Sequence, residues 1–395
     1  MQRKRRWNWK LGLGIAAGVL ALLAVCGLVG WRVLMTYFRN LYYRTEYAPL
    51  ELAVDDVGDC PAEHHLEDVP WFATEEAYCQ SNSLQMIAAQ QGIEEPRGHL
   101  DFLMGFTYGG TEVPGELTFL PYSDPETGFV FAAPYLGLVR RYYVTDDDAL
   151  YRDALRYYLS RGYPVRVGLD MGVLYGAEEQ LPHSEILVGY DEAGFYYYET
   201  VCTSPASCEP GRRPPGDEGL YAPDQRLLDA VLGQATLVSY PWRYSFTVFE
   251  PRALEENLGP VWTRNGQLLV GGARYGPRQG ADAIEALAAR VEERGVKTDV
   301  AANRLGLEAA VYTRRDNAAY LRETFAGQPD VERAAALFSR AADDYQAVLD
   351  SVRDGVADQA EADGIAAWLR DAAAAERQAG EIFLARGRER LPPGS

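Results

Sequence analysis

The chain has 395 residues, of which 47% are hydrophobic and 24% are charged, with a formal net charge of −19 at pH 7. Residues 1–45 contain eight Lys and Arg and no acid, so residues 46–395 carry 30 basic and 57 acidic side chains. The resulting net charge of −27 argues against nucleic acid as a partner, and this length is enough for more than one hydrophobic core.

The N-terminal segment has the pattern of a membrane anchor. Residues 11–31 (LGLGIAAGVLALLAVCGLVGW) carry no charge, and these 21 residues are long enough to cross a hydrocarbon core of roughly 30 Å as a helix. Five basic residues lie within residues 1–10, which favours a cytoplasmic basic segment there and an extracytoplasmic remainder. The sequence therefore predicts a single-pass protein of the cell membrane. A cleaved signal peptide is the alternative, but the apolar run is long for one.

The rest of the chain divides by composition. Residues 32–65 read as an acidic stalk, residues 66–250 alternate helix-like and strand-like patterns, and residues 251–280 read as a linker. Residues 281–390 are rich in Ala, Glu, Arg and Leu at helical spacing, which predicts an all-α helical domain. Its expected helices are 281–294, 299–326, 330–353 and 359–386, separated by Gly and Pro signals.

Within residues 66–250 the first expected helix follows Cys79 and stops near Gly92. Residues 146–162 (DDDALYRDALRYYLSRG) predict another helix, because acids begin it and apolar residues recur on one face. Three strands are expected after it, over residues 164–171, 184–191 and 194–201. The last two are separated by a short turn and are predicted to form a hairpin.

Three residues have the chemistry of a nucleophilic site. Cys79 lies at the start of a helix, where the helix dipole favours a thiolate. Of the four histidines, His183 alone opens a predicted strand, which gives its ring a rigid backbone. In the predicted hairpin, the next strand returns Glu199 to the level of His183, where a carboxylate accepts the ring N–H and orients the imidazole.

These residues occur in segments that resemble a known superfamily. EAYCQSNSLQMIAAQQG resembles the cysteine box of the C39-like, papain-type peptidases, and HSEILVGYDEAGFYYYET resembles their histidine box. Within that superfamily the chain is similar to the N-terminal domain family of the butirosin-biosynthesis protein H, which also has segments like FLMGFTYGG and GYPVRVGLDMGVLY. The likeness covers roughly residues 66–205.

The resemblance implies an α+β, papain-like cysteine-peptidase fold over residues 66–250, with the all-α helical domain after it and the transmembrane helix before it. It also implies Cys79 as nucleophile, His183 as base and Glu199 as orienting acid. The chain departs from the superfamily pattern because Ala73 stands where an oxyanion-hole Gln is usual, Gln80 replaces Gly and Glu199 replaces Asp. The backbone N–H of Cys79, with Thr74 or Gln80, is the expected substitute.

The expected function is therefore that of a membrane-anchored, extracytoplasmic cysteine hydrolase or acyltransferase, which acts on a peptide or amide substrate through a Cys79 thioester. The alternative is a catalytically inactive module that binds a peptide or protein partner at the cell surface. No cofactor or metal site is predicted, since His64 and His65 with Cys60 lack zinc-site spacing.

The cysteines also have a structural interpretation. Five cysteines in an oxidising compartment make disulfides the simplest expectation. Cys202 and Cys208 enclose a five-residue loop and are the nearest pair along the chain. A bridge between Cys60 and Cys79 is then the remaining possibility, and it would block the nucleophile.

Overall fold

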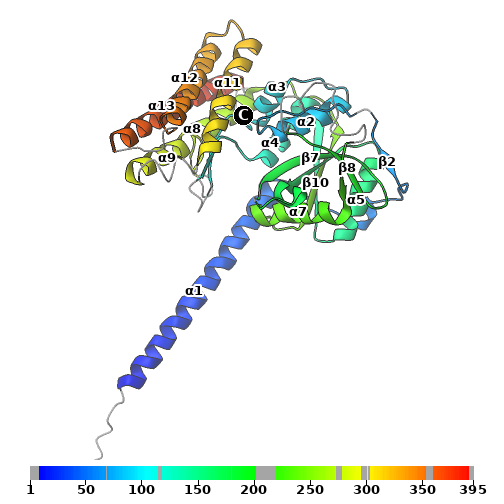
Figure 1. Ribbon diagram of the computed structural model, residues 1–395, viewed down its shortest axis with the longest axis horizontal. Coiled ribbons are helices and arrows are strands. Elements are labelled where there is room, and N and C mark those ends of the chain that lie inside the picture. The colour runs from blue at the N-terminus through cyan, green and yellow to red at the C-terminus, as the bar shows by residue number, and fades with distance from the viewer. Residues whose placement is uncertain are drawn as a thin grey trace, which may run out of the picture.

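A mixed β-sheet forms the centre of one body of the protein (Figure 1). The computed structural model describes residues 9–67, 69–113, 118–178, 180–201, 219–272, 278–294, 300, 303–352 and 359–390. In this part of the chain the main sheet has eight strands in the order β1-β5-β10-β6-β7-β8-β9, with β2 paired to β7. The strands are β1 Leu50–Glu51, β2 His64–His65, β5 Leu138–Thr145, β6 Val165–Asp170, β7 Pro182–Tyr190, β8 Gly194–Tyr198, β9 Leu220–Pro223 and β10 Tyr244–Pro251. β1 runs parallel to β5, and the other pairs are antiparallel.

Helices cover both faces of this sheet. Figure 1 shows α2 and α4 on one face and α5 and α7 on the other. The helices and short 3-10 turns of this body are η1 Val54–Asp56, α2 Cys79–Gln90, α3 Arg97–Met104, α4 Pro125–Ala132, η2 Ala133–Leu136, α5 Asp148–Ser160, α6 Met171–Tyr175 and α7 Asp224–Val238. The expected helices after Cys79 and over residues 146–162 are confirmed as α2 and α5. Leu84, Ile87 and Ala88 form the buried face of α2, as their spacing predicts.

The predicted hairpin is confirmed as β7 and β8, and it contains a β-bulge. Tyr190 pairs with Phe195 and Ile186 with Tyr198, so the register shifts between Leu187 and Gly189. One extra residue in β7 changes which side chains face each other across the two strands. This shift matters for the site because a slip of one residue moves a side chain to the opposite face of a sheet.

In the described part of the chain, five helices form the second body, which includes the predicted helical domain. They are α8 Gly259–Val270, α9 Gly280–Arg294, α11 Arg304–Thr324, α12 Pro329–Ser351 and α13 Gln359–Arg390, and a two-stranded sheet of β3 Thr111–Val113 and β4 Thr118–Leu120 packs on them. α13 contacts α8, α9 and α12, and Leu287, Leu307 and Leu369 are among the residues of their common core. The expected linker over residues 251–280 is therefore corrected, because Val261, Trp262 and Leu269 of α8 are buried in the fold.

The expected stalk over residues 32–65 is also corrected. The N-terminal helix, α1 Trp9–Glu46, ends at the sheet body, where Tyr43 and Tyr47 pack against Tyr142 and Trp242. β1 and β2 then join the main sheet as short strands. Part of this segment is thus held by backbone pairing, which its weakly periodic sequence does not reveal.

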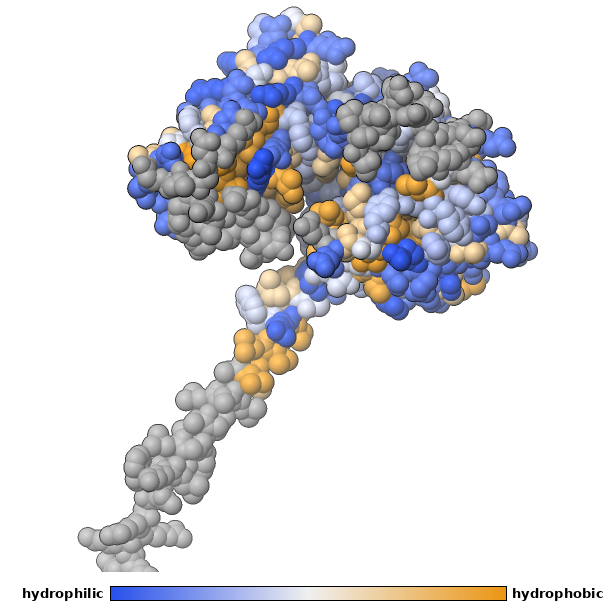
Figure 2. All heavy atoms as spheres, viewed as in Figure 1, coloured by the Kyte–Doolittle hydropathy of each residue, from blue (hydrophilic) through white to orange (hydrophobic). Residues whose placement is uncertain are grey.

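The expected membrane-spanning helix over residues 11–31 is not supported. Across the described residues, no helix combines the length and the apolar character that a membrane crossing needs. α1 projects from the sheet body in Figure 1, and in Figure 2 its described portion shows apolar side chains on the surface.

The fold class expected from the sequence, an α+β papain-like fold with an N-terminal transmembrane helix, is accordingly corrected to a mixed α/β fold. Helices and strands interleave along the chain, with α5 between β5 and β6 and α7 between β9 and β10. The sheet combines one parallel pair with antiparallel pairs. Segregated helices and strands would be the mark of the α+β class.

Candidate active site

Cys79 is the first residue of α2. Its neighbour Tyr78 forms the N-cap with a non-helical backbone, and Cys79 is a half-buried, free thiol. The first backbone N–H groups of a helix have no partner inside the helix, and they give this end a partial positive charge. A negative charge that develops on a substrate bound at Cys79 is therefore favoured by this end of the helix.

Two hydrogen bonds fix α2 against the strands that carry the other site residues. The hydroxyls of Ser83 and Ser184 lie 2.8 Å apart and join α2 to β7 next to His183. The Asn82 side-chain amide donates to the carbonyl of Thr200 at 2.8 Å, next to Glu199. The helix that carries the thiol is thus held against both partner segments.

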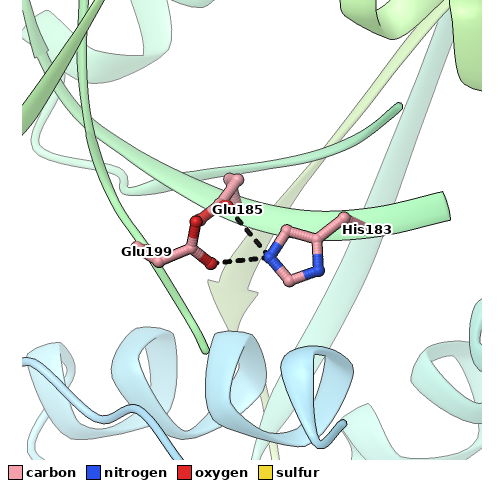
Figure 3. Close-up of side chains that lie close together, drawn as sticks. All are labelled: His183, Glu185 and Glu199. Atoms are coloured by element: carbon pink, nitrogen blue, oxygen red, sulfur yellow. Dashed lines mark hydrogen bonds and ion pairs between the residues drawn. The ribbon is translucent and has the colours of Figure 1, made fainter. Parts of the chain in front are cut away.

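His183 lies on β7, and its ring is buried. Its Nε2 lies 2.7 Å from Oε1 of Glu199, which follows β8 (Figure 3). Continuing the register from Ile186 and Tyr198 places Glu199 opposite Glu185, on the same face of β7 as His183. Without the bulge, Glu199 would face Ile186 on the other side of the sheet.

Cys79 influences the protonation of His183. Burial opposes a charge on His183, but the electrostatic influence of Glu185 and the hydrogen bond and charge of Cys79 hold the pKa of His183 well above its usual range. Since Nε2 is directed at the acids, Nδ1 is the ring nitrogen left for the thiol. The sequence-predicted trio of Cys79, His183 and Glu199 is therefore brought together.

Glu199 is held as a carboxylate. Burial alone would raise its pKa, but the hydrogen bond and charge of His183 and the hydrogen bond from the Tyr175 hydroxyl lower this pKa to about 2. Tyr175 donates to Oε2 at 2.5 Å, and the backbone N–H of Thr200 donates to Oε1 at 2.9 Å. These donors fix the carboxylate, which in turn fixes the plane of the imidazole.

Glu185 is a site residue that the sequence analysis missed. It is fully buried, and its Oε1 lies 3.0 Å from Nε2 of His183. Burial and the charge of Glu199 raise the pKa of Glu185 well above its usual range, although His183 opposes this shift. The two acids beside His183 therefore differ, because burial favours the protonated form of Glu185 whereas hydrogen bonds and the charge of His183 favour the ionised form of Glu199. Its position two residues after His183 in a strand is the signal that would have found it.

The two expected oxyanion donors are placed differently. The Thr74 hydroxyl donates to the carbonyl of Glu76 at 3.0 Å and accepts from the Asn82 amide at 3.0 Å, so its proton is already committed. Gln80 is buried, and its Oε1 accepts from Arg166 at 2.8 Å. Arg166 also donates to Ser184 at 2.9 Å, so one buried guanidinium orients residues on both α2 and β7.

The remaining cysteines lie outside this trio. Cys60 and Cys79 are both free thiols. Cys60 lies beside Tyr190, which it affects electrostatically, at the far end of β7 from His183. Seven residues of strand correspond to roughly 23 Å, so a bridge between Cys60 and Cys79 is incompatible with this fold. The predicted pair of Cys202 and Cys208 falls outside the described residues.

The other histidines have structural contacts. His64 and His65 belong to β2 and pair with Tyr190 and Gly189 of β7. A side chain at Gly189 would come within 2.6 Å of the His65 ring, so the close approach of β2 requires glycine there. The ring of His99 bonds the carboxylate of Glu95 at 2.6 Å.

A divalent cation is the alternative occupant that the site geometry suggests. His183, Glu185 and Glu199 each offer one ligand atom, and these atoms lie within 4.8 Å of one another. Metal binding would require both acids to be ionised and Nε2 to lose its proton. The raised pKa values of Glu185 and His183 oppose this state.

Comparison with known proteins adds no assignment: no protein-family model and no curated protein matches this chain.

Proposed function

We propose that the protein catalyses acyl transfer from a peptide or amide substrate through a thioester on Cys79. The observation that carries the proposal is the 2.7 Å contact between His183 and Glu199, together with the electrostatic influence of Cys79 on His183. A nucleophile, a base that it hydrogen-bonds and a third group that orients the base are the parts that covalent catalysis by a thiol requires. The likeness of the two sequence boxes to C39-like peptidases points to the same chemistry.

The reaction begins with the thiol proton on His183, because the raised pKa of this ring and the helix start at Cys79 favour the ion pair. The Cys79 sulfur attacks the substrate carbonyl carbon and forms a tetrahedral intermediate. His183 then gives its proton to the leaving amine, the C–N bond breaks, and a thioester remains on Cys79.

The second half of the reaction releases the acyl group. Water or a second amine attacks the thioester carbonyl, and His183 accepts the proton that this nucleophile loses. The C–S bond breaks, and the thiolate of Cys79 is restored beside the protonated ring. Hydrolysis and transfer to an amine differ only in this second nucleophile.

The acids have separate roles in this mechanism. Glu199 remains ionised and stabilises the positive ring of His183 at 2.7 Å. Glu185 lies 3.0 Å from Nε2, and burial favours its protonated form. The site therefore balances one anionic carboxylate against one imidazolium while the thiolate reacts.

An inactive binding module is the second candidate. Two observations favour it: Ala73 has no polar side chain, and the Thr74 hydroxyl already donates its proton to the carbonyl of Glu76. Such a module would keep the fold around Cys79 but would not acylate it.

The test follows two reactions of the purified full-length chain. Iodoacetamide alkylation is measured for each thiol near pH 6, where an unassisted cysteine is mostly protonated, and p-nitrophenyl acetate is used to acylate Cys79, with mass spectrometry assigning the site. We expect Cys79 to be alkylated faster than Cys60. The His183→Ala change should slow alkylation of Cys79 but not alkylation of Cys60. A thioester on Cys79 is expected in the wild type and not in Cys79→Ala. Alkylation without any acylation would select the binding module instead.

A further inference from the structure

The hydroxyl groups of Tyr122 and Tyr312 lie beside residues 77–79, which we call the cysteine segment. Tyr312 belongs to α11 of the helical body, and its hydroxyl oxygen accepts the backbone N–H of Ala77 at 3.1 Å. The hydroxyl of Tyr122, which lies between β4 and α4, is 2.7 Å from that of Tyr312. Ala77 is two residues before Cys79, so both hydroxyls approach the start of α2.

Both tyrosines of the pair remain partly accessible. The rings of Tyr78 and Tyr312 are 5.5 Å apart, and Tyr122 and Tyr312 are each half-buried. Tyr312 also lines a cavity of about 260 Å³ between α11 and α12, together with Val311 and Leu349. The cavity leaves Tyr312 accessible from the side of the helical body.

The protons of the pair can be counted. The two hydroxyls carry two hydrogens, and one of these forms the bond between the two oxygens. The N–H of Ala77 occupies one acceptor site on Tyr312 but uses no hydroxyl proton. One O–H group therefore remains available to donate to a third group, whichever way the bond between the tyrosines runs.

The charge of Cys79 contributes to a raised pKa of both Tyr122 and Tyr312. Burial, Tyr312 and the charge of Cys79 raise the pKa of Tyr122 well above its usual range. Burial also raises the pKa of Tyr312, with contributions from Glu76 and Cys79, although hydrogen bonds from Tyr122 and Ala77 oppose the shift. Both phenols therefore keep their protons at working pH, as a hydrogen-bond donor must.

We propose that the Tyr122–Tyr312 hydroxyl pair donates the side-chain hydrogen bond that stabilises the oxyanion formed on attack by Cys79, so that the helical body completes the active site. This inference rests on the proposed acyl transfer. The backbone N–H of Cys79 is the second donor, because it has no partner within the helix. A phenol is a suitable partner for an oxyanion because its O–H is a stronger acid than an amide N–H.

The other candidates for this role are less well placed. Ala73 has no polar side chain, and the Thr74 hydroxyl donates its hydrogen bond to the carbonyl of Glu76. Gln80 is held through its carbonyl by Arg166 on the buried side of α2. The tyrosine pair retains an uncommitted O–H group on the side of α2 that faces the helical body.

A hydrogen-bonded bridge keeps α11 in place against α2. Asp316, one turn after Tyr312, accepts from the Tyr78 hydroxyl at 2.7 Å and from the Arg97 guanidinium at 2.7 Å. The guanidinium also lies over the Tyr78 ring, 3.8 Å from its centroid. The position of Tyr312 relative to Cys79 is thus fixed by contacts on both sides of the body interface.

The test compares two reactions that differ in their need for an oxyanion donor. Acylation of Cys79 by p-nitrophenyl acetate passes through a tetrahedral oxyanion, whereas alkylation by iodoacetamide does not. Both rates are measured on the full-length wild type, on Tyr122→Phe, on Tyr312→Phe and on the double variant. We expect the double variant to be acylated on the order of 100-fold more slowly and at least one single variant to lose most of that rate. All alkylation rates should stay unchanged.

The matched control is Thr107→Val, which removes a 2.8 Å hydrogen bond to Asn317 across the same interface but away from Cys79. It should leave both rates unchanged. If wild-type Cys79 is not acylated, the proposed function fails and this inference fails with it. If the double variant is acylated as fast as the wild type, only this inference is wrong. A parallel fall of acylation and alkylation would show that the hydroxyls act through folding, and it would also overturn the inference.

Discussion

Nε2 of His183 lies 2.7 Å from Oε1 of Glu199, and this contact depends on the β-bulge between Leu187 and Gly189. The extra residue in β7 brings Glu199 opposite Glu185, on the face where His183 also lies. A regular hairpin would direct Glu199 to the other face of the sheet. The bulge is therefore the feature of the backbone that assembles the orienting acid with the base.

Replacing Glu199 with Gln should slow acylation of Cys79. The amide retains the shape of the carboxylate but loses the charge that stabilises the imidazolium of His183. We expect a loss of roughly 10²-fold in the acylation rate near neutral pH, measured by single-turnover release of p-nitrophenolate. Glu192→Gln, at an exposed position in the turn after β7, is the matched control and should react like the wild type. An equal rate for Glu199→Gln would remove Glu199 from the mechanism.

Replacing Glu185 with Gln should change the pH dependence of stability. The pKa of Glu185 is raised in the folded state, so between its unfolded pKa near 4.5 and its folded pKa the folded chain binds more protons than the unfolded chain. The contribution of Glu185 to stability therefore falls as pH rises through this window, by up to about 1.4 kcal/mol per pH unit. Glutamine cannot ionise, so the free energy of unfolding of Glu185→Gln should increase relative to that of the wild type as pH rises above about 5.

Urea unfolding at several pH values measures this gain. The free energy of unfolding of Glu185→Gln relative to the wild type should increase steadily with pH, whereas Glu192→Gln should show a constant difference. If the difference in the free energy of unfolding between Glu185→Gln and the wild type stays constant or decreases with pH, Glu185 is ionised in the folded protein. That outcome would also favour the divalent cation, which needs both acids in their charged forms.

Arg166→Met should destabilise the fold strongly. Arg166 is 2% exposed and pairs with Glu126, while its other bonds reach Gln80 and Ser184. Removing it leaves a buried carboxylate with only Arg140 as a cationic partner. We expect a loss of about 3–5 kcal/mol in the free energy of unfolding, measured by urea titration.

The control for this variant is Arg141→Met on β5. Arg141 pairs with Glu250 at 3.0 Å, but both side chains are partly exposed to solvent. This change should cost less than about 1 kcal/mol. Similar losses for Arg141→Met and Arg166→Met would show that burial does not determine how much an ion pair contributes to the free energy of unfolding.

Local patterns in the sequence predicted much of the structure. The apolar spacing after Cys79 and within residues 146–162 corresponds to α2 and α5, and the alternation in residues 184–201 corresponds to the β7–β8 hairpin. The four helices expected after residue 280 correspond to α9, α11, α12 and α13. Helix and hairpin periodicity is set by neighbours within a few residues, so it can be read without knowing the fold.

Contacts between distant segments could not be predicted in this way. Glu185 is charged, and its burial becomes understandable only when Glu199 and His183 are seen beside it. Tyr122 and Tyr312 are 190 residues apart, and no periodicity relates them. The pairing of β1 with β5 likewise depends on the assembled sheet, since two residues carry too little pattern to predict a strand.

Replacing Gly266 with Ala should separate α8 from α13. A Cβ at Gly266 would lie 2.7 Å from the carbonyl oxygen of Gly380, so the two helices must move apart to accept it. Overpacking of this kind costs about 1–3 kcal/mol, which urea unfolding would measure as a lower free energy of unfolding. Gly364→Ala on α13 is the matched control, because among the described residues no atom outside its own turn of helix lies within 4 Å of the added methyl group. There the better helix propensity of alanine should stabilise the protein by up to about 1 kcal/mol. Stabilisation by both changes would mean that the α8–α13 contact is looser than the structure shows.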